Sequence, residues 1–295
     1  MTTNVKFKIR GHESFFIRKG WLNKGLRAVS TSPRVFVDKN KNPMDVLGIG
    51  SNMVKSLRYW MQATGLTNET KVIGQELTDI GQVIYKNDKY IEEIGTLWIL
   101  HYMLATNESM ATSWYFFFNE FKLTEFNKDD FVLHFRRFLN DFEISVRSLE
   151  DDFNCIINTY VPHIKSSPSK VLPENNIDCP FGELGLIDIV SKKEKIYRKQ
   201  SPAIDTMHPL IVLAFILRQA NESKEIKIND LQYSSNGIGN IFNLDPISMI
   251  NILYKLEIMG YVKVIRTAGL DVIRINTALT SIECLQEYYK LINNR

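Results

Sequence analysis

The chain has 295 residues, and 44% of them are hydrophobic, which is enough for one large core or about two or three smaller ones. Its three cysteines are widely separated and no C-x-x-C pair occurs, which argues against a disulfide framework and against a structural zinc site. The net charge of +3 is too small to indicate a partner by itself.

The distribution of charge is more informative than its total. Residues 1–60 contain 12 Lys/Arg against 3 Asp/Glu, whereas residues 86–160 contain 7 against 13. A basic first fifth followed by an acidic middle suggests one surface that faces a polyanion and a second, different surface. Asymmetry of this size is also common among soluble proteins, so charge alone leaves nucleic-acid binding open.

No segment has the character of a signal peptide or a membrane span. The start, MTTNVKFKIR, is not followed by an apolar run, and the most apolar stretch, 91–104, contains two glutamates and is too short to cross a bilayer. We therefore expect a cytoplasmic protein with no membrane partner.

The first predicted elements lie in the basic segment. A short helix is expected over 21–29, and Pro33 ends it. In the next helical stretch Met53, Leu57, Trp60 and Met61 recur with helical spacing and form one buried stripe, and Gly65 suits its C-terminal cap. A short extended piece over 71–76 and a helix over 77–85 follow, with Thr78 as its N-cap. Helix, turn, helix and extended segments in this order indicate a winged helix-turn-helix, with the second helix entering a DNA groove.

The middle of the chain is expected to be helical and aromatic. Six aromatic side chains fall within residues 114–121, and such a run is typical of a core rather than of a base-stacking platform. Residues 127–142 have helical period with Asn127 as the cap, and the polar, proline-bearing stretch 164–180 suggests a linker or an active loop.

The C-terminal part shows the clearest pattern. Asp245 and Pro246 begin a helix that runs to Met259, and two strands over 261–266 and 271–276 follow, before a last helix over 280–292. This order indicates a second winged helix. The predicted fold class is therefore mostly α, with two winged helix-turn-helix modules flanking a helical middle region. The predicted divisions are a DNA-binding domain at 1–88, a helical domain at 89–163, a linker or active loop at 164–206 and a winged-helix domain at 207–295.

Several chemistries lack their motifs. The glycines of GIGSN are not followed by the Lys-Ser/Thr of a phosphate loop, and the five histidines form no H-E-x-x-H. His12 stands in a polar GHES segment that suits either a hydrogen-bonded turn or catalysis. Glu150, Asp151 and Asp152, taken with acids further along, suit either a solvated face or a carboxylate site for Mg²⁺. The candidate catalytic residues are Asp152, Asp178 and Glu183, and the candidate Mg²⁺ ligands are Asp152 and Asp178.

DNA binding is the signal with the most support. Lysine and arginine suit phosphates and guanine edges, and asparagine and glutamine suit adenine. The alternative is that winged modules serve as protein-interaction modules. The candidate DNA-binding residues are Arg10, His12, Arg18, Lys19, Lys24, Asn52, Lys55, Arg58, Tyr59 and Gln62.

Five blocks of the sequence resemble a known family in order and over nearly the whole chain. They read GHESFFIRKGWLNKG, GIGSNMVKSLRYWMQATGL, IEEIGTLWILHYMLATN, ATSWYFFFNEF and CPFGELGLI. The family is a bacterial domain-of-unknown-function family that occurs beside DNA phosphorothioation genes. Its characterised member type is the DNA-nicking component of the Ssp phosphorothioation and phage-defence system.

The resemblance implies a DNA-binding protein that works with a cysteine desulfurase, a sulfur-transfer ATP pyrophosphatase and an ATPase. It carries over no catalytic residue. The expected function is that of a double-stranded-DNA-binding protein of a phosphorothioate modification and phage-defence system, which nicks DNA with Mg²⁺. The alternative is a non-enzymatic winged-helix adaptor or transcriptional regulator, and a homodimer is left open.

Overall fold

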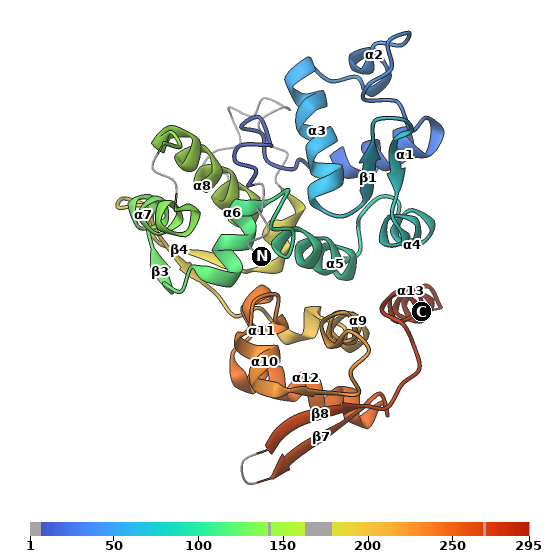
Figure 1. Cartoon of the computed structure of the whole chain (residues 1–295), viewed down its shortest axis with the longest axis vertical. Helices are drawn as coiled ribbons and strands as arrows, with labels where there is room; N and C mark the ends of the chain where they lie inside the picture. Colours follow the sequence, from blue (N-terminus) through green and yellow to red (C-terminus); the bar gives the residue numbers. More distant parts are fainter. Residues whose placement is uncertain (1–6, 141–142, 163–178, 268–269, 295) are drawn as a thin grey trace, which may run out of the picture. The chain divides into compact units, whose positions relative to one another are not determined.

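The computed structural model describes residues 7–140, 143–162, 179–267 and 270–294. The chain divides into two compact units. Unit 1 comprises Met1–Phe117 and Phe121–Gln200, and unit 2 comprises Phe118–Glu120 and Ser201–Arg295. Figure 1 draws both units.

Unit 1 holds most of the helices. They are α1 (Trp21–Thr31), α2 (Pro43–Leu47), α3 (Ser51–Ala63), α4 (Asp79–Asn87), α5 (Ile94–Ala105), α6 (Thr112–Tyr115), α7 (Lys128–Leu139), α8 (Val146–Tyr160) and the 3-10 helix η4 (Pro180–Leu184). The π-helix η1 (Phe116–Glu120) begins in unit 1 and ends in unit 2. The strands are β1 (Thr67–Thr70), β2 (Gly74–Leu77), β3 (Glu125–Phe126), β4 (Ile187–Ser191) and β5 (Ile196–Lys199).

The first elements of unit 1 pack around α3. Helix α1 contacts both α3 and β2, and all three lie together in Figure 1. The loop after α1 is tied to the β1–β2 hairpin because Gln75 donates its backbone N–H to the carbonyl of Pro33 at 2.8 Å. At Gly74, with φ of 97°, a Cβ would lie 2.3 Å from that same carbonyl oxygen, so only glycine allows this close approach.

The predicted aromatic core is confirmed. Trp114, Phe116, Phe117 and Phe121 are each at most 3% exposed. Phe116 stacks on Phe135 of α7 with 4.8 Å between ring centroids. Burial of each such side chain stabilises the fold by about 1.5–3 kcal/mol, so this cluster is a main source of stability for unit 1.

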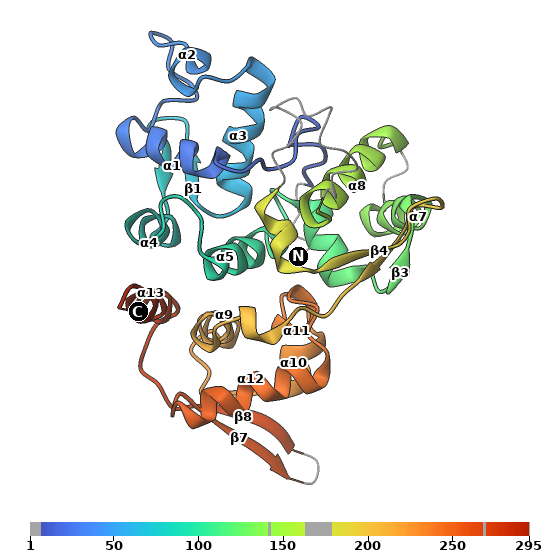
Figure 2. The same cartoon turned by 180° about the vertical axis from the view of Figure 1, so that it is seen from behind.

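Unit 2 consists of η5 (Ile204–Thr206), α9 (Pro209–Ala220), β6 (Glu225–Lys227), α10 (Ile228–Tyr233), α11 (Ile238–Ile241), α12 (Pro246–Ile258), β7 (Val262–Thr267), β8 (Leu270–Ile275) and α13 (Ser281–Asn293). Helix α9 is buried along most of its length and packs on α12 and α13. Figure 2 shows β7 and β8 running beside α12. The predicted cap of α12 is confirmed, since the Asp245 carboxylate accepts from the N–H groups of Ile247 and Ser248, both at 2.9 Å.

The predicted fold class is wrong. About 53% of the chain is helical and 13% lies in strands, which form three small sheets, so the class is mixed α/β and two winged helix-turn-helix modules are not supported. The middle region is not wholly helical, because it contains β3, which pairs antiparallel with β5 far along the chain, and β5 also pairs with β4 in a local hairpin. In the first predicted module, α2 and a long loop separate α1 from α3, where a helix-turn-helix needs a short turn, and its hairpin has two strands only.

The predicted four-part domain division stays a prediction, because contacts within one conformation do not test which segments fold alone. Of the predicted linker or active loop at 164–206, residues 164–178 lie outside the described residues, and residues 179–206 contain η4, β4, β5 and η5. None of the helices in the described part of the chain combines the length and apolar composition needed to cross a membrane.

Candidate nucleic-acid interface

Helix α3 is the amphipathic helix that the sequence predicts. Leu57, Trp60 and Met61 are fully buried, whereas Met53 is only half-buried. The Trp60 indole donates to the Phe15 carbonyl at 2.9 Å, which fastens the segment before α1 to the inner face of α3. Gly65 follows the helix with φ of 69°, as expected of its C-terminal cap.

The outer face of α3 borders a groove of about 450 Å³, here named the α3 groove. Its walls come from α3, from the segment before α1 and from the β1–β2 hairpin. The charged residues that line it are Lys8, Glu13, Lys55, Arg58, Glu69 and Lys71. Four cations against two carboxylates leave a net of two positive charges, which favours an anionic ligand.

Glu69 of β1 organises the centre of the groove. Its carboxylate accepts from Arg58 Nε at 2.9 Å, from Gln62 Nε2 at 3.0 Å and from Gln75 Nε2 at 3.1 Å, and a second, close bond joins it to Arg58 Nη2. The hydrogen bond from Arg58 is the main reason that the pKa of Glu69 is lowered, and the same bond raises the pKa of Arg58. Both groups are therefore ionised at neutral pH. The network fixes Arg58 and Gln62 on the groove wall, and Arg58 Nη1 makes no hydrogen bond among the described residues.

The remaining cations of the groove are less constrained. Lys55 and Lys71 are exposed and form no ion pair within the part of the chain that the structure describes. The only hydrogen bond that the Lys55 side chain makes among the described residues is a long one of 3.5 Å to Asn52 Oδ1. Lys8 lies over the ring of Tyr59, with 5.3 Å from its Nζ to the ring centroid. Lys55 and Lys71 are thus the cations most available to a phosphate.

Below the groove a buried histidine–aspartate pair holds the segment before α1. His12 Nε2 lies 2.7 Å from Asp152 Oδ1, and the two side chains are 1% exposed. The Ser14 N–H donates to His12 Nδ1 at 3.1 Å, so the imidazole proton lies on Nε2 and is donated to Asp152. The backbone N–H of Arg10 adds a bond of 2.9 Å to the same oxygen, and the Ser113 hydroxyl donates to the other. His12 is therefore part of a hydrogen-bonded turn, and its ring is inaccessible to DNA.

This arrangement bears on the predicted Mg²⁺ ligands. Both oxygens of Asp152 already accept hydrogen bonds, and its side chain is buried, whereas Mg²⁺ keeps several waters and needs near-octahedral oxygen ligands. Asp178 lies outside the described residues, and Glu183 of η4 is exposed. Across the described ranges, no group of three or more His, Cys, Asp and Glu side chains is placed to hold a metal ion. The described residues around Asp152 therefore do not fit a Mg²⁺ site.

The other candidate DNA-binding residues fall in several places. Tyr59 is 4% exposed, and a Cβ on Gly11 would lie 2.5 Å from its ring, so the tyrosine packs into the groove wall. Arg18 lies over the Trp21 ring at 5.4 Å, Lys24 lines a different cavity, and Lys19 and Asn52 are exposed. Arg10 pairs with Asp151 at 2.9 Å.

Sequence reasoning missed Lys8, Glu69 and Lys71 as groove residues. The signal for Lys71 is its place in the turn of a short hairpin, next to the basic helix. Glu69 has no such signal, because its role depends on tertiary contact between β1 and α3.

Comparison with known proteins agrees with this architecture. The family model for a protein of unknown function (DUF4007) matches residues 9–289, and the chain belongs to this family. Two solved structures are similar: a magnesium-ion-bound SspB crystal structure, with 24% identity and a TM-score of 0.82, and an SspB crystal structure, with 25% identity and a TM-score of 0.81. Each likeness covers 98% of this chain and 89% of the other. No curated protein matches the chain.

Proposed function

We propose that this protein binds double-stranded DNA through the α3 groove, as a component of an Ssp-type phosphorothioation and phage-defence system. The observation that carries the proposal is the set of accessible cations around a rigid Arg58–Glu69 centre in the most basic part of the chain. The likeness to SspB supports the assignment to an Ssp-type system. The proposed partners of this protein are a cysteine desulfurase, a sulfur-transfer ATP pyrophosphatase and an ATPase.

Lys55 and Lys71 contact the DNA backbone in this proposal. Each releases counterions when it neutralises a phosphate, which gives affinity without sequence preference. Sequence preference would come from neighbouring polar side chains such as Asn52, which is exposed on the same helix.

The test compares a groove variant with a charge-matched control. Lys55→Ala with Lys71→Ala removes two groove cations, and Lys192→Ala with Lys193→Ala removes two exposed cations from the turn between β4 and β5. Fluorescence anisotropy with a labelled duplex at about 100 mM salt measures Kd. We expect the groove variant to bind at least about tenfold more weakly and the control within about twofold of wild type. Equal losses in both would contradict the proposal.

Nicking of DNA with Mg²⁺ is a second candidate function, favoured by the magnesium ion in the similar SspB structure. The candidate catalytic residues Asp178 and Glu183 remain predictions, and Asp152 is better explained as a structural carboxylate. Purified protein is incubated with supercoiled plasmid and MgCl₂, with and without EDTA. Nicking would be supported if the wild type forms open circles with MgCl₂ but not with EDTA, and if Asp178→Ala or Glu183→Ala abolishes them. Intact DNA binding with no relaxation would favour a non-enzymatic adaptor.

A further inference from the structure

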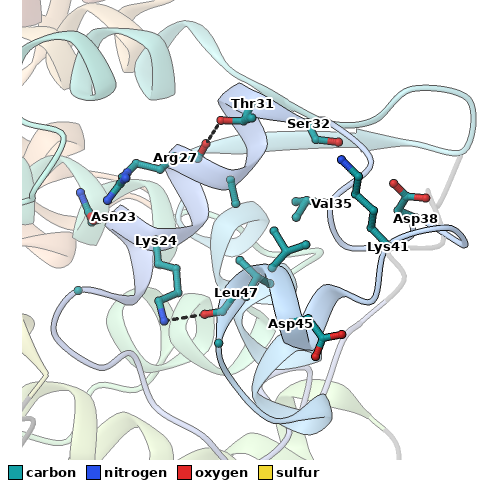
Figure 3. A pocket seen from close by; sticks show the side chains of 14 residues that line it. Asn23, Lys24, Arg27, Thr31, Ser32, Val35, Asp38, Lys41, Asp45 and Leu47 are labelled. Carbon is teal, nitrogen blue, oxygen red and sulfur yellow. Dashed lines mark hydrogen bonds between the residues drawn. The ribbon is translucent and has the colours of Figure 1, made fainter.

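A second hollow of unit 1 lies between α1, α2 and the loop that joins them, and it is here named the α1–α2 cavity (Figure 3). Its volume is about 570 Å³, within the usual range of about 300–1,000 Å³ for small-molecule sites. The α3 groove shares no lining residue with this cavity.

The cavity is built from locally fixed parts. Lys24 of α1 donates to the Leu47 carbonyl of α2 at 2.7 Å, a bond drawn in Figure 3, and Gly48 turns the chain there with φ of 62°. In the joining loop, the Asn40 N–H donates to Asp38 Oδ1 at 2.8 Å. The walls are therefore shaped before any ligand arrives, which lowers the entropic cost of binding.

Part of the wall is apolar. Val35 and Leu47, both labelled in Figure 3, are 4% and 3% exposed, so their side chains form a packed floor, and Ala28 of α1 also lines the cavity. A flat aromatic group could lie against this surface and bury apolar area on one face.

The rest of the wall is charged, with cations in excess. Lys24, Arg27 and Lys41 face Asp38 and Asp45, a net of one positive charge. Among the described residues, neither Arg27 nor Lys41 forms an ion pair. In Figure 3 Arg27 and Lys24 lie on one side of the cavity and Lys41 on the other, with Asp38 beside Lys41.

We propose that the α1–α2 cavity binds a single nucleoside phosphate. Arg27 and Lys24 contact the phosphate, because hydrogen bonds from charged donors to phosphate are stronger than those between neutral groups. The base lies on Ala28 and Val35, and Asp38 or Asp45 accepts from its amino group or from the sugar hydroxyl. The ligand is either a free nucleotide or an unpaired nucleotide of a DNA strand, since both present the same groups.

The test uses the full chain and isothermal titration with dAMP, dCMP, dGMP and TMP. Deoxyadenosine, which lacks the phosphate, and inorganic phosphate, which lacks the base, are the ligand controls. We expect saturable binding of at least one nucleotide below about 1 mM, and binding at least about tenfold weaker for both partial ligands.

Three variants locate the site. Arg27→Ala removes the cation and Ala28→Phe fills the floor, and each is expected to weaken binding at least about tenfold. Lys39→Ala removes an exposed cation of the same loop that does not line the cavity, and it is expected to bind as wild type does. If no nucleotide binds, or if Arg27→Ala and Ala28→Phe both bind as wild type, the proposal is wrong.

A competition experiment distinguishes the two sources. A duplex with one unpaired nucleotide that displaces a bound fluorescent dAMP analogue identifies the DNA strand as the ligand, and binding of dAMP without displacement identifies a free nucleotide. The inference does not depend on DNA binding at the α3 groove, because Lys55→Ala with Lys71→Ala leaves the cavity intact and is expected to keep dAMP affinity.

Discussion

The guanidinium of Arg58 on α3 and the carboxylate of Glu69 on β1 are joined by two hydrogen bonds, one of them 2.9 Å from Nε to Oε2. This pair connects the helix to the hairpin and sets the charge at the centre of the α3 groove. Arg58 is therefore positioned by the protein before any DNA arrives, while Glu69 reduces the positive field that DNA would meet.

Replacing Glu69 by glutamine tests that balance. Glu69→Gln removes one negative charge and replaces one of the two acceptor oxygens that Arg58 uses with an NH₂ group, so we expect DNA to bind about threefold more tightly at low salt. Because the Arg58 side chain is 38% exposed, the loss in unfolding free energy should stay below about 1 kcal/mol. Glu125→Gln, at the exposed Arg198–Glu125 pair of the β3–β5 sheet, is the matched control and should leave affinity unchanged. Weaker DNA binding by Glu69→Gln would contradict the assigned role.

The buried carboxylate of Asp152 is expected to stabilise the fold of unit 1. Asp152→Ala leaves the His12 ring N–H, the Arg10 N–H and the Ser113 hydroxyl without their acceptor, at a cost of about 2–4 kcal/mol. Asp151→Ala removes only the ion pair with Arg10, whose side chain is 45% exposed, and should cost less than about 1 kcal/mol.

The measurement is urea unfolding followed by tryptophan fluorescence. The chain has 4 tryptophans, Trp21, Trp60, Trp98 and Trp114, and all of them lie in unit 1. The signal therefore reports the unit that contains Asp152. Equal stability of Asp152→Ala and Asp151→Ala would show that the His12–Asp152 pair does not hold the fold.

Gly11 and Tyr59 should show coupled energetics. A Cβ at Gly11 would lie 2.5 Å from the Tyr59 ring, so Gly11→Ala must displace that ring and is expected to cost about 1–3 kcal/mol. In Gly11→Ala with Tyr59→Ala the clash is absent, so the double variant should lose less stability than the sum of the single variants. Strict additivity in the same fluorescence assay would mean that the two residues do not meet.

Lys199 gives unit 1 a specific dependence on pH. Its Nζ donates to the Phe117 carbonyl at 2.7 Å, and burial of the amine, with a smaller effect of Lys122, lowers its pKa to about 7. In the unfolded chain a lysine has a pKa of about 10.4. Between these values the unfolded state binds the additional proton, so the unfolding free energy rises with pH, by at most about 1.4 kcal/mol per pH unit.

The test compares slopes rather than absolute stability. Lys199→Met should lose the increase between pH 7 and pH 10, whereas Lys192→Met, at an exposed lysine of the same hairpin, should keep it. Parallel pH profiles for wild type and Lys199→Met would show that the Lys199 pKa is not lowered in the folded protein.

Local patterns predicted the elements whose signals are local. The stripe of Leu57, Trp60 and Met61 predicted α3, and the Asp245 cap with Pro246 predicted the start of α12. The three-stranded β3–β5–β4 sheet of unit 1 was missed because β3 has two residues and its Phe126 pairs with Tyr197, far along the chain. No local periodicity records such a pairing.

The sequence predicted only the part of the candidate site that lies on one helix, because the rest depends on tertiary contacts. Lys55, Arg58 and Gln62 were identified from their place on α3, and they do line one groove. Tyr59 was expected on the outer face, but the segment around Gly11 covers it, and that contact depends on tertiary structure. Asp152 was selected for its neighbouring acids, yet its hydrogen-bond donors, His12 and Ser113, come from distant segments.

The dependence of DNA affinity on salt tests the central claim most directly. For duplex DNA the slope of log Kobs against log salt falls by about 0.9 for each phosphate contact. We predict that Lys55→Ala with Lys71→Ala reduces the magnitude of the slope by about 2, while Lys192→Ala with Lys193→Ala leaves it unchanged. An unchanged slope in the groove variant, with DNA still bound, would contradict DNA binding at the α3 groove.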